Sequence, residues 1–233
     1  MIRCLFLVEG AYDKQRLALL ENLFDSARLE IIPFGCDRLI GYEYYKNYKE
    51  HINAVLSKEK TFEINDFDYI VQVCDLDGCF IDEKYVVENK ELKKVKYHAS
   101  FIEAVDRDSI ISRNHIKVEN INNLLIDNDI ILFYNSTNID HAFDGVQNAA
   151  DKVKRSGAIN MYNEYKNKHL EFFKKLYDSN KLKSISYESS WIDAKIGFNS
   201  LQANSNLIFF VDMFKDYLKE EIKKEYEKLV NSN

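Results

Sequence analysis

Carboxylates follow two apolar segments of strand length, and their spacing suits them to chemistry. Glu9 follows the apolar run Cys4 to Val8, and Asp75 and Asp77 end a second run that begins at Tyr69. The ends of strands in an open α/β sheet face the crevice where ligands bind, and residues two apart in an extended segment point to the same side. Converging carboxylates repel one another unless a cation lies among them, and oxygen ligands suit Mg²⁺ or Mn²⁺. We therefore expect Glu9, Asp75 and Asp77 to form a divalent metal site if the two strands are neighbours.

Each motif also has an ordinary structural explanation. Acidic residues after a strand commonly cap a helix or favour its N-terminus. Gly10 allows a tight turn after the first strand, and Asp13 is placed to be the N-cap of an amphipathic helix over residues 13–27. The matching character of the two segments favours the metal site over two unrelated caps.

The motifs Glu9-Gly10-x-x-Asp13 and Asp75-x-Asp77-Gly78 resemble the TOPRIM domain of topoisomerases, bacterial primases, RNA-maturation nucleases and OLD-type nucleases. The resemblance implies that Glu9, Asp75 and Asp77 are catalytic and hold divalent metal, with Asp13 matching a further acidic position of the nuclease branch. The chain is most similar to small stand-alone members found in bacterial phage defence, including RloB-like and other abortive-infection proteins. The resemblance covers about the first 85 residues well and residues 86–150 loosely.

A later segment has a weaker likeness to the same proteins. Some of them carry S-N-P-x-[hydrophobic]-E, and Asn135-Ser-Thr-Asn-Ile-Asp140 has Thr137 for the proline and Asp140 for the glutamate. Asp140 is thus a candidate further metal ligand. His141 beside it is a candidate proton carrier, although a lone histidine after a strand is more often structural.

Alternating segment types predict an α/β fold. Expected strands over residues 4–8, 28–34, 69–75 and 130–134 form a TOPRIM-like (Rossmann-like), mostly parallel sheet flanked by helices. A helix over residues 42–58, rich in Tyr and Lys, lies within an insertion at about 36–66. Residues 118–126 are expected to be short and helical or irregular. Residues 1–155 would form the α/β domain. Residues 156–233 would be a helical C-terminal extension packed on it, with long helices over 158–179 and 204–231.

Composition limits the functional classes. The chain has 233 residues and a formal net charge of −6, which argues against a protein that coats nucleic acid electrostatically. Local contacts to phosphate are expected from Lys152, Lys154 and Arg155. The four cysteines form no C-x-x-C pair, and we find no secretory leader or apolar run of membrane length. We expect a cytoplasmic protein that is not inserted in a membrane.

These observations together predict a metal-dependent nuclease using Mg²⁺ or Mn²⁺ on DNA or RNA, tRNA included. The resemblance adds a role in anti-phage defence, with an ATPase companion protein or a homodimer as partners. Two alternatives stay open. Asp75-x-Asp77-Gly78 also resembles the opening motif of HAD-type phosphatases, with Asn135-Ser136-Thr137 as their second motif. The chain could instead be a non-catalytic TOPRIM scaffold, because a fold alone does not establish activity.

Overall fold

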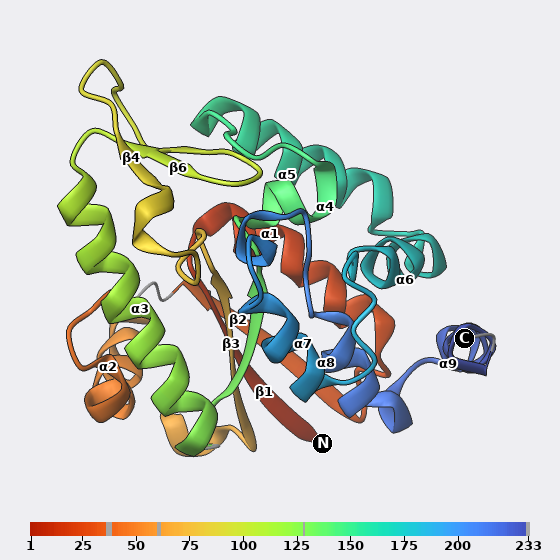
Figure 1. Ribbon diagram of the computed structural model, residues 1–233. Helices are drawn as coiled ribbons and strands as arrows, with labels where there is room; N and C mark the ends of the chain where they lie inside the picture. The colour runs from red at the N-terminus through yellow and green to blue at the C-terminus, as the bar shows by residue number, and fades with distance from the viewer. Residues whose placement is uncertain (36–38, 60–61, 128, 232–233) are drawn as a thin grey trace.

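A four-stranded parallel sheet forms the centre of the protein (Figure 1). The computed structural model describes residues 1–35, 39–59, 62–127 and 129–231. The strands are β1 (Ile2–Val8), β2 (Leu29–Gly35), β3 (Tyr69–Asp75) and β7 (Ile131–Asn135), in the order β2-β1-β3-β7. All three pairings are parallel. The expected α/β class and the four expected strands are confirmed, and the strands that end in Glu9 and Asp75 are neighbours.

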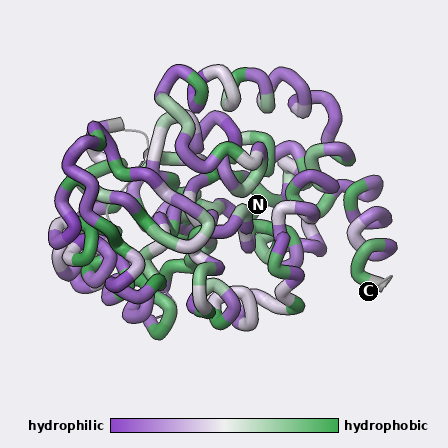
Figure 2. Tube along the Cα trace, turned by 45° about the horizontal axis from the view of Figure 1, so that its top comes forward, coloured by the Kyte–Doolittle hydropathy of each residue, from purple (hydrophilic) through white to green (hydrophobic). Residues whose placement is uncertain are grey.

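Side chains alternate between the two faces of this sheet, and both faces are buried. Phe6 and Val73 belong to one core, whereas Leu5, Cys74 and Leu132 belong to the other. The first core is covered by the helices α1 (Ala11–Leu17), α4 (Ile139–Asp144), α5 (Asp151–Tyr165), α6 (His169–Asp178), α8 (Ile208–Met213) and α9 (Glu220–Asn231). The second is covered by α2 (Tyr44–Glu59), α3 (Arg107–Asp127) and α7 (Tyr187–Ala194). Polar and apolar residues alternate along the outer helices in Figure 2, as expected of helices with one buried face.

The C-terminal part of the chain completes the first core. The Phe210 ring of α8 packs edge-on against Phe6 of β1 and Phe133 of β7, with ring centroids 5.2 Å and 5.9 Å apart. The two long helices expected here are each interrupted. Residues 166–168 separate α5 from α6, and the 3₁₀ turn Lys215–Tyr217 separates α8 from α9. The described residues after α5 thus pack on the sheet as short helices that wrap around it.

A second, smaller sheet lies beyond the carboxyl ends of the central strands (Figure 1). Its strands are β4 (Val86–Glu88), β5 (Lys96–Tyr97) and β6 (Ile102–Ala104), in the order β4-β6-β5. This sheet was not predicted from the sequence. The expectation of a short element over 118–126 is also wrong, because those residues are the second half of the 21-residue helix α3.

The insertion around 36–66 contains α2, which begins two residues later than expected. Tyr44 and Tyr48 are buried against the sheet, so α2 is an amphipathic helix whose tyrosine rings belong to the core. Cys36 lies outside the described residues. Among the helices that are described, none is long and apolar enough to span a membrane.

Candidate metal and nucleic-acid site

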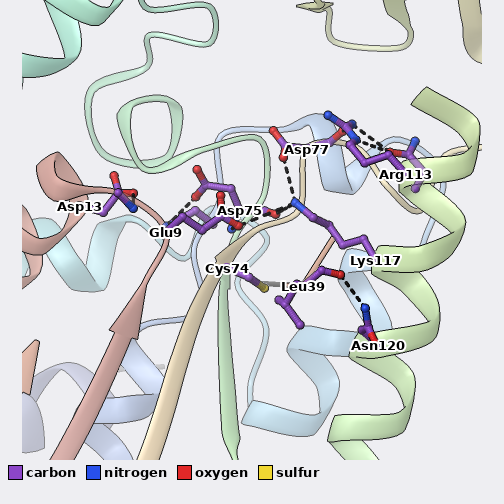
Figure 3. A network of polar contacts seen from close by, with 12 residues as sticks. Glu9, Asp13, Leu39, Cys74, Asp75, Asp77, Arg113, Lys117 and Asn120 are labelled. Atoms are coloured by element: carbon purple, nitrogen blue, oxygen red, sulfur yellow. Dashed lines mark hydrogen bonds and ion pairs between the residues drawn. The ribbon is translucent and has the colours of Figure 1, made fainter. Parts of the chain in front are cut away.

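Glu9 and Asp75 meet at the carboxyl edge of the central sheet (Figure 3). Glu9 directly follows β1, and Asp75 is the last residue of the neighbouring β3. The backbone N–H of Asp75 donates a hydrogen bond of 3.0 Å to Glu9 Oε1. From the other side, Asn135 Nδ2 at the end of β7 donates a 3.2 Å bond to Asp75 Oδ1. Three adjacent strand ends therefore position this pair of carboxylates.

Asp13 lies beside Glu9, in the first turn of α1. The helix begins at Ala11 and its N-cap is Gly10, so the expectation that Asp13 itself is the N-cap is wrong. Asp13 instead accepts a 2.8 Å hydrogen bond on Oδ2 from the backbone N–H of Gly10. This bond holds the carboxylate next to the turn that follows Glu9.

Asp77 points away from that pair, toward α3 (Figure 3). The strand ends at Asp75, and Asp77 adopts a left-handed backbone with φ of 52°, followed by Gly78 at 68°. The extended geometry that would place Asp75 and Asp77 on the same side is therefore absent. Asp77 is close to the site, but its carboxylate faces a different set of partners.

The main partner of Asp77 is Lys117, a residue that the sequence analysis missed. Its Nζ lies 2.9 Å from Asp77 Oδ2, 2.7 Å from the backbone oxygen of Asp75 and 3.8 Å from Glu9 Oε1. The Lys117 side chain is only 1% exposed. Its position on α3 gives the available sequence signal, because the buried positions 110, 114, 117, 121 and 124 recur at helical spacing. A lysine within such a stripe needs a buried anion as its partner.

Arg113, one turn earlier on α3, connects the site to the small sheet. Its Nη1 donates a 3.1 Å hydrogen bond to the hydroxyl of Tyr97 in β5, and its Nη2 donates one of 3.4 Å to the backbone oxygen of Asp77. Asp77 is therefore held by two cationic side chains of one helix, at both its carboxylate and its carbonyl.

The electrostatic surroundings separate Asp75 from Asp77. Burial raises the pKa of Asp75 well above its ordinary value, and the neighbouring charges of Glu9 and Asp13 raise it further. Burial also acts to raise the pKa of Asp77, but Lys117 and Arg113 outweigh it and leave that pKa below its ordinary value. The repulsion between carboxylates is therefore concentrated at Asp75, next to Glu9 and Asp13.

This side fits a hard divalent cation. Within the described ranges, no three His, Cys, Asp or Glu side chains lie close enough together to enclose a metal ion by themselves. Mg²⁺ does not require such a cage, because it usually keeps several waters and binds through one or two carboxylates plus substrate phosphates. Glu9 and Asp75 supply two partly buried carboxylates at one edge of the sheet, which suits that mode of binding.

Asp140 has a different partner from the other candidate ligands. Its Oδ1 lies 2.7 Å from Nη2 of the fully buried Arg16, which also contacts Asp144 Oδ2 at 3.0 Å. Gly157 of α5 packs directly over this guanidinium. The Asp140 carboxylate thus joins α4 to α1 and α5. The neighbouring His141 places Nδ1 3.1 Å from Thr137 Oγ1, and burial lowers its pKa.

The residues after β7 are covered by a segment that is distant in sequence. Ser136 and Thr137 are fully buried. The backbone N–H of Ser136 donates a 2.8 Å bond to Asn204 O, and Thr137 Oγ1 donates one of 3.1 Å to Leu201 O. The same segment contacts the D-x-D-G turn, where Gly78 N donates a 3.2 Å bond to Ser200 O. This cover buries the hydroxyls that a HAD-type second motif would present to a phosphate.

The predicted phosphate contacts lie on α5, which packs against α1. Lys152 and Arg155 are exposed and Lys154 is half-buried; we call these three residues the basic face of α5. The charge of Lys154 acts to lower the pKa of Asp13, which places this lysine within electrostatic reach of the carboxylates.

The small sheet is attached to the loop before this helix. Asn148 and Tyr97 exchange two hydrogen bonds of 2.8 Å and 2.9 Å through the Asn148 side chain. Lys94 lies 3.7 Å from Asp151 at the start of α5. The small sheet and the basic face of α5 therefore share one border of the carboxylate site.

In comparisons with known proteins, no family model, no curated protein and no solved structure matches the chain.

Proposed function

We propose that this protein is a divalent-metal-dependent nuclease that hydrolyses phosphodiester bonds in DNA or RNA. One observation carries the proposal: Glu9 and Asp75 meet at the ends of adjacent parallel strands, with Asp13 and Asp77 close by. Asp75 lies in partly buried surroundings where Glu9 and Asp13 repel its carboxylate, and a cation bound there would relieve that repulsion. The TOPRIM-like pattern of the same residues supports this function.

The proposed site holds Mg²⁺ or Mn²⁺ on Glu9 and Asp75. When bound, such an ion lowers the pKa of a water ligand and stabilises the charge that develops on a phosphoryl group in transfer. Asn135 and the Asp75 backbone N–H orient the two carboxylates. Lys117 adds a fixed positive charge beside them, where it favours an anionic transition state.

The substrate enters next to the basic face of α5. An overall charge of −6 disfavours binding to nucleic acid at other surfaces. Lys154 places positive charge near Asp13, beside the carboxylates where the phosphate backbone would bind. Comparing DNA and RNA substrates identifies the class of nucleic acid that is cleaved.

The same resemblance supports placing this activity in anti-phage defence in the bacterial cytoplasm. An ATPase companion protein or a second copy of the chain would be the partner. These parts of the proposal rest on the resemblance alone, so a partner ATPase belongs in the assay as a separate arm.

The decisive experiment incubates the purified protein with Mg²⁺ or Mn²⁺ and with plasmid, single-stranded DNA or total tRNA. Glu9→Gln and Asp75→Asn test the site. Asp82→Asn is the matched control, because this exposed carboxylate follows the same strand and pairs with Lys84 instead. We expect metal-dependent cleavage that is lost in the two site variants and retained in the control.

Loss of activity in Asp75→Asn must not reflect unfolding. Because Glu9 and Asp13 repel the Asp75 carboxylate, we expect Asp75→Asn to raise the melting temperature of the metal-free protein. Differential scanning calorimetry in EDTA measures this change, and a lower melting temperature would contradict the charge repulsion.

Other outcomes separate the rival functions. Hydrolysis of para-nitrophenyl phosphate without cleavage of nucleic acid would indicate a phosphatase that uses Asp75 and Asp77. Binding of nucleic acid without turnover in any arm, the ATPase arm included, would indicate a non-catalytic scaffold. Either result would refute the proposed nuclease.

A further inference from the structure

We infer that Lys117 permanently occupies the position of a second cation, so that the site takes a single divalent ion on Glu9 and Asp75. This inference rests on the proposed function and deepens it. It also removes Asp77 from the set of metal ligands, although the sequence pattern includes it.

The contacts of Lys117 are those of a bound cation. Its Nζ is surrounded by three oxygens from different residues: Asp77 Oδ2 at 2.9 Å, Asp75 O at 2.7 Å and Glu9 Oε1 at 3.8 Å. Two of these residues are the ones that a metal between the two strands would use. An ammonium group at this point excludes a metal ion from the side of Asp77, because two cations would share the same oxygens.

The lysine is also fixed in place. Its side chain is 1% exposed, and α3 is anchored on either side of it. Asn120, one turn later, donates hydrogen bonds of 2.7 Å and 2.8 Å to the backbone oxygens of Leu39 and Gly41. Arg113, one turn earlier, binds Asp77 O and Tyr97. The anchored helix fixes the backbone of Lys117, and its burial together with the bonds to Asp75 O and Asp77 Oδ2 holds the ammonium group in the site.

The formal charges agree with a single ion. Glu9, Asp13, Asp75 and Asp77 carry −4 together, and Lys117 and Arg113 reduce this to −2 (−4 + 2). One divalent cation neutralises the remainder, whereas a second would leave an excess of two positive charges. A pair of divalent ions would suit these carboxylates better if Lys117 were absent.

The test is the stoichiometry of Mn²⁺ binding, measured by isothermal titration calorimetry and by electron paramagnetic resonance on the full chain without substrate. We expect the wild type to bind one ion with the spectrum of an isolated Mn²⁺. Glu9→Gln and Asp75→Asn should weaken binding by at least about tenfold. Asp77→Asn should keep a stoichiometry of one, because Lys117 and Arg113 already engage that residue.

Lys117→Met provides the complementary result. It removes the ammonium group and keeps an unbranched apolar stem, and we expect it to bind a second Mn²⁺ that broadens the spectrum through spin coupling. Lys117→Arg is the matched control and should stay at one ion. If Lys117→Met fails to fold, the wild type and Asp77→Asn still test the inference.

Two results would refute the single-ion site, and they differ in whether the nuclease proposal is refuted as well. Two ions in the wild type, or loss of the only ion in Asp77→Asn, would refute the single-ion site while the nuclease proposal stands. Absence of Mn²⁺ binding in the wild type, together with absence of cleavage, would refute both.

Discussion

Replacing Gly157 with alanine should destabilise the protein, which is opposite to the usual effect in a helix. Gly157 lies inside α5, and exchange of glycine for alanine within a helix ordinarily stabilises by about 1 kcal/mol. Here an added Cβ would lie 2.5 Å from Arg16 Nη2 and 3.7 Å from Asp140 Oδ1. The guanidinium would have to move.

The cost follows from the surroundings of Arg16. The side chain is fully buried and its Nη2 binds both Asp140 and Asp144, so it cannot swing into solvent. Loss of one partner from a buried ion pair costs about 3–5 kcal/mol. Alanine at position 157 would displace the Arg16 guanidinium without removing it, so we expect a loss of about half of this free energy. The higher helix propensity of alanine contributes about 1 kcal/mol of stability. The net destabilisation is therefore about 1 kcal/mol.

Urea denaturation followed by circular dichroism measures this difference. Ser156→Ala is the matched control on the same helix, because Ser156 is exposed and its hydroxyl donates a local hydrogen bond to Val153 O. We expect the control to change the free energy of unfolding by less than about 0.5 kcal/mol. A Gly157→Ala protein as stable as the wild type, or more stable, would refute the close packing of α5 on Arg16.

Two further predictions concern surface charge. Changing the basic face of α5 to glutamates should weaken nucleic-acid binding. The slope of log K against log salt concentration should become shallower by about one unit for each phosphate contact that is lost. Lys224→Glu on α9 is the control, and its affinity and salt dependence should equal those of the wild type. Fluorescence anisotropy measures binding between 50 and 200 mM salt, roughly the range over which phosphate contacts lose most affinity. Asn89 and His98 bond to Glu103 and hold its pKa below the ordinary value. Because the folded-state pKa is the lower one, this carboxylate stabilises the protein above its unfolded pKa of about 4.3, and that contribution is lost as the pH falls through the folded pKa. Denaturation at a series of pH values should therefore show a shallower loss of stability on acidification for Glu103→Gln than for the wild type, and parallel curves would contradict the pairing.

The central sheet was predictable because its signals are local. Runs such as Cys4–Val8 are apolar throughout, and burial on both faces of a parallel sheet requires that composition. Glu9 and Asp75 follow such runs directly, so their meeting at one edge required only that β1 and β3 be neighbours.

The features that were missed depend on partners distant in sequence. The spacing of buried positions on α3 marks Lys117 as an inward-facing lysine, but its partners Asp77 and Glu9 lie 40 and more residues away in the sequence. The turn of Asp77 away from Asp75 comes from a left-handed backbone at a residue other than glycine. The strands of the small sheet have only two or three residues, too few to show an alternating pattern.

The segment of residues 200–204 that covers the residues after β7 determines when the site can first form during synthesis. Strands β1, β3 and β7 and the carboxylates leave the ribosome early, but Ser200, Leu201 and Asn204, which close the D-x-D-G turn and the residues after β7, follow much later. A nascent or truncated chain that ends before them leaves Gly78 and Ser136 without these backbone partners. We expect chains that end before residue 200 to lack a formed site, because the turn after Asp77 and the residues after β7 would have no cover.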